Sequence, residues 1–239
     1  MNDALRRTFD RSIAENRYPG RGLIIGRNGQ GDWTLVYWIM GRSENSRNRQ
    51  FAVDGGTLRT RAHDPSRVVD PSLIIYEAML ELPGVQLVSN GDQTRTIHDA
   101  LARGSSFEAA LGTRVHEPDA PHYTPRISGM LDLRGPEPSV RLSILRASPF
   151  DPSATDRMFF HVAAPAPGSG RGLTTYAGDG DPLPSFSGDP LCLPLEGSGA
   201  DIITRYWSAL DADNRIALAV KTVAPDGRCR ELRVQNRYV

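Results

Sequence analysis

Two apolar runs separated by a glycine-rich turn place the strongest constraint on the fold of this chain. Residues 22–27 (GLIIGR) and 32–41 (DWTLVYWIMG) are joined by Asn28-Gly29-Gln30-Gly31. Asn-Gly between strand-like runs is a strong β-hairpin signal. Before them, residues 3–17 carry apolar side chains at four-residue spacing, which predicts a short amphipathic helix. We therefore expect a helix followed by an antiparallel pair of strands.

The rest of the chain alternates between short strand-like runs and short helix-like segments. Strands are expected over residues 49–53, 58–62, 72–80, 84–89, 126–133, 140–147 and 157–166, with a closing hairpin over 214–223 and 230–239. Helices are expected over residues 93–101, 107–112 and 200–210. Residues 164–198 are rich in Pro, Gly, Ser and Asp and are expected to form long loops. Mixed strands and helices in one continuous core indicate an α+β fold, with residues 1–239 as a single domain.

Charge and composition exclude several classes of function. The formal net charge is zero, which argues against a nucleic-acid binder. No run reaches the roughly 18 apolar residues of a membrane span, and the N-terminal segment lacks the apolar core of a signal peptide. Cys192 and Cys229 have no CxxC spacing and are expected to be reduced, and the five histidines form no metal-binding pattern. We expect a cytoplasmic protein without metal or cofactor.

Polar residues gather where the expected strands begin and end. Arginine forks and backbone amides next to glycine suit a phosphate, and Tyr and Glu side chains can move protons. Each position also has a purely structural interpretation: a solvated arginine face, a turn with a helix cap, a core tyrosine or a loop carboxylate. The candidates are Arg21, the cluster Arg42 to Arg49 with Asn45, Tyr76, the run Asn90-Gly91-Asp92, Glu117, Thr124 and Arg126.

Taken together, five motifs resemble the archaeal-type IMP cyclohydrolase family. They are YPGRG (18–22), IMGRSENSRNR (39–49), DPSLIIY (70–76), NGDQTRTI (90–97) and YTPRISG (123–129). The resemblance implies a four-layer αββα sandwich like that of the N-terminal-nucleophile hydrolases. The chain begins Met1-Asn2-Asp3 and has no Cys, Ser or Thr before Thr8, so the implied branch uses this scaffold without the nucleophile.

The implied reaction closes the second purine ring. The substrate is 5-formamidoimidazole-4-carboxamide ribotide (FAICAR), and the products are inosine 5′-monophosphate (IMP) and water. The carboxamide nitrogen attacks the formyl carbon and the carbinolamine then loses hydroxide, without covalent intermediate or cofactor. By resemblance, Arg47 lies near the formamide, Tyr76 donates to the formyl oxygen and Glu117 accepts a proton. The implied substrate-binding residues are Arg21, Arg42, Asn45, Asn90, Gly91, Asp92, Thr124 and Arg126.

Two departures and two alternatives accompany this resemblance. Glu77 stands where family members commonly have Asn, so an added carboxylate is expected beside the site, and residues 164–198 look longer than a compact member needs. The chain could instead be an amidohydrolase acting on a related ribotide, or a catalytically silent purine-nucleotide-binding module. The resemblance to the family implies a homo-oligomer, a dimer or a tetramer. The expected partner is a small-molecule substrate, and neither nucleic acid nor a membrane is expected.

Overall fold

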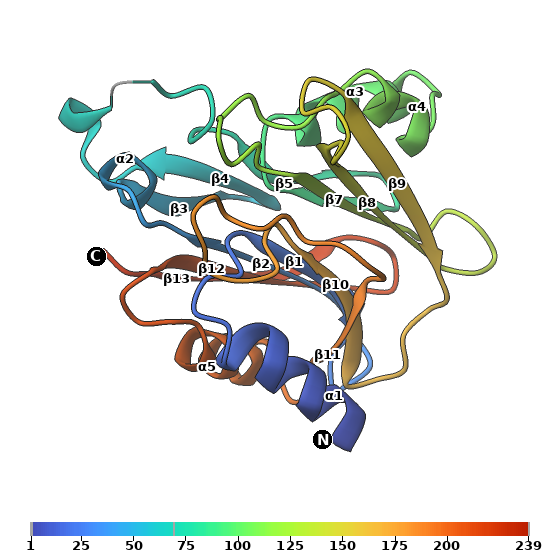
Figure 1. The fold of residues 1–239 in the computed structure, drawn as a ribbon. Coiled ribbons are helices and arrows are strands. Elements are labelled where there is room, and N and C mark those ends of the chain that lie inside the picture. Colours follow the sequence, from blue (N-terminus) through green and yellow to red (C-terminus); the bar gives the residue numbers. More distant parts are fainter. Residues whose placement is uncertain (1, 69, 239) are drawn as a thin grey trace.

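Two antiparallel β-sheets stacked face to face form the centre of this computed structural model, which describes residues 2–68 and 70–238 (Figure 1). The six-stranded sheet has the order β11 (Leu191–Pro194), β10 (Ser169–Thr174), β1 (Gly22–Arg27), β2 (Trp33–Met40), β12 (Arg215–Val223) and β13 (Cys229–Asn236). The seven-stranded sheet runs in sequence order through β3 (Arg49–Asp54), β4 (Thr57–Ala62), β5 (Glu77–Leu82), β6 (Val85–Ser89), β7 (Arg126–Asp132), β8 (Ser139–Ala147) and β9 (Thr155–Val162).

Helices cover the outer face of each sheet, so the layers follow the order α, β, β, α (Figure 1). The six-stranded sheet is covered by α1 (Asp3–Phe9), which continues as π-helix over Asp10–Ala14, and by α5 (Gly199–Ala209). The seven-stranded sheet is covered by α3 (Gln93–Ala102) and α4 (Phe107–Gly112). The short helix α2 (Glu44–Arg47) lies in the crossing from β2 to β3, and a 3-10 turn occupies Pro65–Arg67.

Three apolar clusters explain this layering. The largest fills the space between the sheets, and all eight residues of β2 are buried because this strand is covered on both faces. A second cluster lies under α1 and α5, where Tyr206 packs between Phe9 and Trp38. A third lies under α3 and α4. Burial of this apolar surface on both faces of both sheets is the main favourable contribution to folding.

The predicted hairpin of β1 and β2 is confirmed. Arg27 pairs with Trp33, and the Asn28 side chain accepts the backbone N–H groups of Gln30 and Asp32, each at 2.9 Å. Gly31 has a φ of +87°, a conformation that favours glycine. The closing hairpin of β12 and β13 is confirmed as well. The two cysteines are free, as expected, and lie on the opposite edge strands β11 and β13.

The prediction of long loops over residues 164–198 is wrong in part, because this segment supplies β10 and β11. β10 pairs with β1 from Gly170 to Thr174, and β11 forms the edge beside it. The glycines there are a packing requirement, since a Cβ at Gly170 would lie 2.6 Å from Ile24. The strand expected over residues 72–80 begins only at Glu77, because the carbonyl of Pro71 accepts the N–H groups of Ile74 and Ile75 in a turn.

The first expected helix is shorter than predicted, since it ends at Ala14 instead of residue 17. No helix in the described part of the chain combines the length and apolar character that crossing a bilayer requires.

Gly22 opens β1 against the buried indole of Trp38. A Cβ at this position would lie 1.9 Å from Cζ2 of that ring, so Gly22→Ala forces the core to shift. We expect it to lower the free energy of unfolding by about 1–3 kcal/mol, measured by urea unfolding. Gly112→Ala in α4 is the matched control, since no described residue offers an atom within 4 Å, and it should be neutral or stabilising. Equal losses in both variants would contradict this packing argument.

Candidate active site

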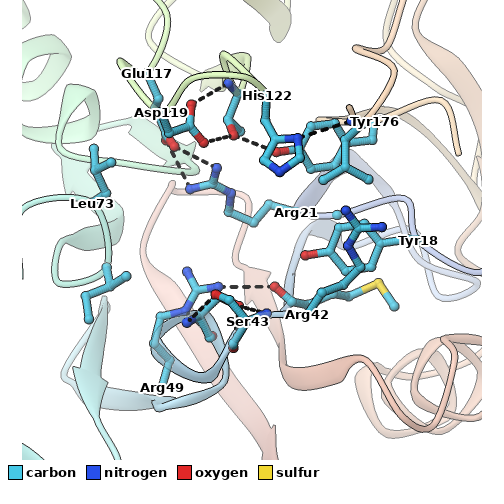
Figure 2. A pocket seen from close by; sticks show the side chains of 16 residues that line it. Tyr18, Arg21, Arg42, Ser43, Arg49, Leu73, Glu117, Asp119, His122 and Tyr176 are labelled. Atoms are coloured by element: carbon cyan, nitrogen blue, oxygen red, sulfur yellow. Dashed lines mark hydrogen bonds and ion pairs between the residues drawn. The ribbon is translucent and has the colours of Figure 1, made fainter. Parts of the chain in front are cut away.

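A cavity of about 260 Å³ opens where the two sheets meet at the start of β1 and β7 (Figure 2). Its walls come from segments far apart in the sequence, mostly the connections that precede β1, β3, β5 and β7 and the segment that follows β10. The lining residues that carry chemistry are Tyr18, Arg21, Arg42, Ser43, Arg49, Glu117, Asp119, His122, Thr124 and Tyr176.

A buried ion pair forms one end of the cavity, here called the acid end. Arg21 holds Glu117 in a two-pronged contact, with Nη1 to Oε1 at 3.0 Å and Nη2 to Oε2 at 2.9 Å. Both residues are almost fully buried, at 8% and 2% exposure. Burial, the largest influence, raises the pKa of the Glu117 carboxyl above its ordinary value, although the Arg21 guanidinium opposes the rise. A carboxylate with a raised pKa is suited to proton transfer near neutral pH.

Two arginines form the opposite end, here called the arginine end. Arg49 is only 3% exposed, and it donates to the carbonyls of Ser46 at 2.8 Å and Met40 at 3.1 Å. Among the described residues Arg49 has no carboxylate partner, so its charge is balanced by backbone dipoles alone. Arg42 contacts Asp179 at 2.6 Å and lies over the ring of Tyr18, 5.1 Å from its centroid. A buried guanidinium without a counter-ion favours an anionic ligand.

A chain of hydroxyl groups lies beside the acid end. Asp119 contacts the hydroxyl of Thr124 through Oδ2, and its Oδ1 accepts the Thr124 backbone N–H at 2.7 Å. The same Thr124 hydroxyl lies 2.5 Å from the hydroxyl of Tyr176. Burial raises the pKa of Tyr176 to about 12, so this side chain stays neutral around pH 7. Thr124 and Tyr176 are buried, whereas Asp119 is half-buried and in contact with solvent.

Four of the predicted site residues line the cavity, namely Arg21, Arg42, Glu117 and Thr124. Four others form a network behind its wall. The side chain of Asn90 accepts the Ile127 N–H at 2.8 Å and donates to the Pro125 carbonyl. The backbone carbonyl of Asn90 accepts a hydrogen bond from Arg21. Arg126 donates to Asp92 at 2.8 Å and to Gln93. Gly91 leaves room for this contact, since a Cβ there would lie 2.7 Å from Nη1 of Arg126.

The remaining predicted residues lie away from the cavity. The hydroxyl of Tyr76 contacts that of Tyr37 at 2.7 Å within the core between the sheets. Arg47 turns from the cavity and donates to the Gly41 carbonyl and to Asn214. Asn45 is exposed on α2.

The carboxylate expected beside the site, that of Glu77, lies away from the cavity lining. It pairs instead with Arg95 on α3 at 2.7 Å and with Arg59 on β4 at 3.3 Å.

Sequence reasoning missed Tyr18, Asp119, His122 and Tyr176 as cavity residues, and it named Arg49 only as a member of the arginine cluster, without a role of its own. Tyr18 and Arg49 stand inside the quoted motifs, and Asp119 and His122 lie just before one of them, so proximity to the motifs was the available signal. Tyr176 carried no signal, because it lies in the segment that was expected to form loops. Within residues 2–68 and 70–238, no group of three or more His, Cys, Asp or Glu side chains is placed to hold a metal ion.

Fold and cavity together define a two-sheet α+β protein whose cavity has Arg49, bonded to backbone carbonyls, at one end and the buried pair of Arg21 and Glu117 at the other. The chain belongs to the family described as IMP cyclohydrolase-like protein, which it matches over residues 18–227. An IMP cyclohydrolase of Methanopyrus kandleri is 28% identical over 162 residues, covering 66% of this chain and 75% of the relative. An IMP cyclohydrolase of Methanothrix thermoacetophila is 31% identical over 121 residues, covering 49% of this chain and 59% of the relative.

Because Arg21 and Glu117 are buried, removing one partner of this ion pair should cost far more stability than removing one partner of an exposed pair. Arg21→Met leaves a buried carboxylate uncompensated and is expected to lower the free energy of unfolding by about 3–5 kcal/mol. The control is Arg228→Met, which removes an exposed pair with Asp226 and should change stability little. Urea unfolding at pH 7 measures both, and a loss for Arg21→Met no greater than for the control would contradict the burial argument.

Proposed function

We propose that this protein is an IMP cyclohydrolase, which converts FAICAR to IMP and water in the last step of de novo purine biosynthesis. Family membership supports the reaction class. The observation that carries the proposal is the polarity of one cavity, with Glu117 at one end and, at the other, the guanidinium of Arg49, which has no carboxylate partner among the described residues. A ribotide has the same polarity, since its phosphate is anionic and its base carries the reacting amide and formyl groups.

In the bound complex, the phosphate lies at the arginine end, where Arg49 and Arg42 supply forked donors. The base lies towards the acid end. Binding in this direction folds the formamido group towards the carboxamide, so that positioning supplies a large part of the rate enhancement. No cofactor is required, because nucleophile and electrophile belong to one molecule.

In ring closure, Glu117 accepts a proton from the attacking carboxamide, and Arg21 compensates the charge of this carboxylate. In this proposal Tyr76 donates to the formyl oxygen as charge develops there, which requires the bound base to open a path to its hydroxyl, since that hydroxyl lies in the core outside the cavity lining. The hydrogen bond between Tyr76 and Tyr37 uses one of two hydroxyl hydrogens, so one O–H of the pair remains free to donate. A role of Arg47 near the formamide, which the resemblance implies, requires its side chain to leave Gly41 and Asn214 and to reach from the arginine end towards the base.

The proposal extends to the scaffold. The order of helix, sheet, sheet and helix layers is the one that the resemblance implies, and it supports assigning the chain to a scaffold like that of the N-terminal-nucleophile hydrolases. Catalysis then rests on acid–base and electrostatic groups inside the cavity.

Glu117→Gln tests the reaction and the role of the carboxylate together. The purified protein should convert FAICAR to IMP, followed by ultraviolet absorbance, and the variant should lower kcat by about 10²–10⁴-fold because its amide cannot accept a proton. The Gln side chain still accepts a hydrogen bond from Arg21, so the fold is expected to persist. Saturable binding of IMP without turnover would instead identify a silent nucleotide-binding module, and hydrolysis of a related ribotide would identify an amidohydrolase.

The pH dependence of the wild-type protein gives a second measure of the same role. Glu117 must be ionised to accept a proton, and burial raises its pKa. As pH decreases, kcat should therefore begin to fall at a pH above the ordinary pKa of a Glu side chain, about 4.3. The contribution of Glu117 to the free energy of unfolding changes with pH in the direction opposite to kcat. The raised pKa favours the folded state at acidic pH, and this contribution is lost as pH rises through the pKa of the folded protein. An acid limb of kcat at or below the ordinary range would contradict this assignment.

Substitutions of Arg49 and Arg47 separate phosphate binding from catalysis. Arg49→Met removes charged hydrogen bonds to the phosphate and should raise KM by about tenfold or more with little change in kcat. Arg47→Ala should lower kcat, because its proposed contact forms with the reacting formamide. Steady-state kinetics with FAICAR measure both variants. Full activity of Arg47→Ala would remove this residue from the mechanism, and an unchanged KM for Arg49→Met would place the phosphate elsewhere.

A further inference from the structure

The proposed reaction requires two nitrogen-bound protons to leave the substrate. One leaves the carboxamide during ring closure, and Glu117 accepts it. The other leaves the formamido nitrogen when the carbinolamine loses hydroxide and the ring double bond forms. Both oxygens of Glu117 already contact the Arg21 guanidinium. With a separate acceptor for the second proton, this one carboxylate does not have to accept both protons.

The hydrogen-bond chain at Tyr176 has a fixed direction. The Asp119 carboxylate can only accept, so the Thr124 hydroxyl donates its single hydrogen to Oδ2 of Asp119. The Thr124 oxygen therefore accepts the hydrogen of the Tyr176 hydroxyl, 2.5 Å away. It follows that the Tyr176 oxygen presents lone pairs, and no hydrogen, to the cavity that it lines.

Neighbouring groups do not offer the same chemistry. Nδ1 of His122 accepts the backbone N–H of Leu183 at 3.2 Å, so its other ring nitrogen carries the hydrogen and acts as a donor. The hydroxyl of Tyr18 is close to the positive charges of Arg49, Arg21 and Arg42. Asp119 also lines the cavity, but its two carboxylate oxygens already accept the N–H and hydroxyl groups of Thr124. Glu117 and Tyr176 therefore remain as the acceptors at the end of the cavity where the base is proposed to lie.

We propose that Tyr176, Thr124 and Asp119 form a proton relay that accepts the formamido proton in the dehydration step. The inference rests on the proposed function of the same cavity. As the C–O bond breaks and hydroxide leaves, the electrons of the N–H bond form the ring C=N bond, and the proton passes to the Tyr176 oxygen. Tyr176 passes its own hydrogen to Thr124, and Thr124 passes its hydrogen to Asp119. The half-buried Asp119 releases the proton to solvent, where it balances the departing hydroxide as water.

In this arrangement Tyr176 is the catalytic residue, because it touches the substrate, and Asp119 is a positioning residue and the final acceptor. Tyr176 never exists as a free tyrosinate, because each hydrogen it gains is matched by one that it gives to Thr124. The relay thereby works with a hydroxyl that remains neutral at the working pH.

The decisive pair of variants is Thr124→Val and Thr124→Ser. Valine keeps the shape of threonine but has no hydroxyl, and serine keeps the hydroxyl without the methyl group. Thr124→Val should lower kcat by about 10²-fold with KM unchanged, and Thr124→Ser should retain most of kcat. Tyr176→Phe should behave like Thr124→Val. Tyr206→Phe removes another buried tyrosine hydroxyl, bonded to the Pro194 carbonyl outside the cavity, and should leave kcat unchanged.

A proton inventory distinguishes a relay from a purely structural role. The dependence of kcat on the deuterium fraction of the solvent should be curved in the wild type and in Thr124→Ser, because several hydrogens move together. It should become linear in Thr124→Val and Tyr176→Phe. Thermal unfolding checks that each variant is folded at the assay temperature.

The outcomes separate the relay from the reaction itself. Normal turnover of FAICAR by the wild type, together with wild-type kcat and a curved inventory in Thr124→Val, would overturn the relay and leave the proposed function intact. Equal loss in Thr124→Ser and Thr124→Val would assign the effect to packing and also overturn the relay. Absence of turnover by the wild type would overturn the proposed function, and with it a relay for this reaction.

Discussion

The contact between Arg21 and Glu117 joins the two sheets at the end that holds the cavity. Arg21 immediately precedes β1 of the six-stranded sheet, and Glu117 lies in the segment that leads to β7 of the seven-stranded sheet. The same guanidinium donates to the carbonyl of Asn90, whose side chain in turn fixes the start of β7. A buried ion pair contributes little net stability compared with apolar packing, since desolvation offsets its attraction. Its consequence here is geometric, because it sets the separation and direction of two chemically active walls.

Arg21 and Arg49 illustrate how one residue type serves two functions in one cavity. Arg21 is neutralised by a carboxylate and is therefore part of the protein's internal structure. Arg49 is equally buried but has only carbonyl partners among the described residues, and in the proposed complex the substrate phosphate supplies its counter-charge. Lys221, the one lysine of the chain, is absent from this site and pairs with Glu81. A forked donor suits both tasks better than an ammonium group.

The parts of the fold that could be predicted from sequence are those with local causes. The turn at Asn28 depends on side-chain contacts within four residues, and β1 and β2 follow from it. β10 could not be predicted, because its glycines are required by close contact with β1, a neighbour in space only. For the candidate site, residues such as Arg21 and Glu117 could be named, but the direction of a side chain could not. Arg47 and Arg49 stand two positions apart, and only Arg49 lines the cavity.

The second half of the chain, which carries few motifs, supplies a wall of the cavity through backbone pairing with the first. The N–H of Thr175 donates to the carbonyl of Arg21 at 2.8 Å, and that of Tyr176 donates to Pro19 at 3.2 Å. These bonds continue the pairing of β10 with β1 and bring Tyr176 within reach of Thr124, 52 positions earlier. The segment beyond closes the opposite side through the contact of Asp179 with Arg42. The pairing of β10 with β1 therefore holds the wall from the second half of the chain against the residues of the first half. Neither half forms the cavity alone.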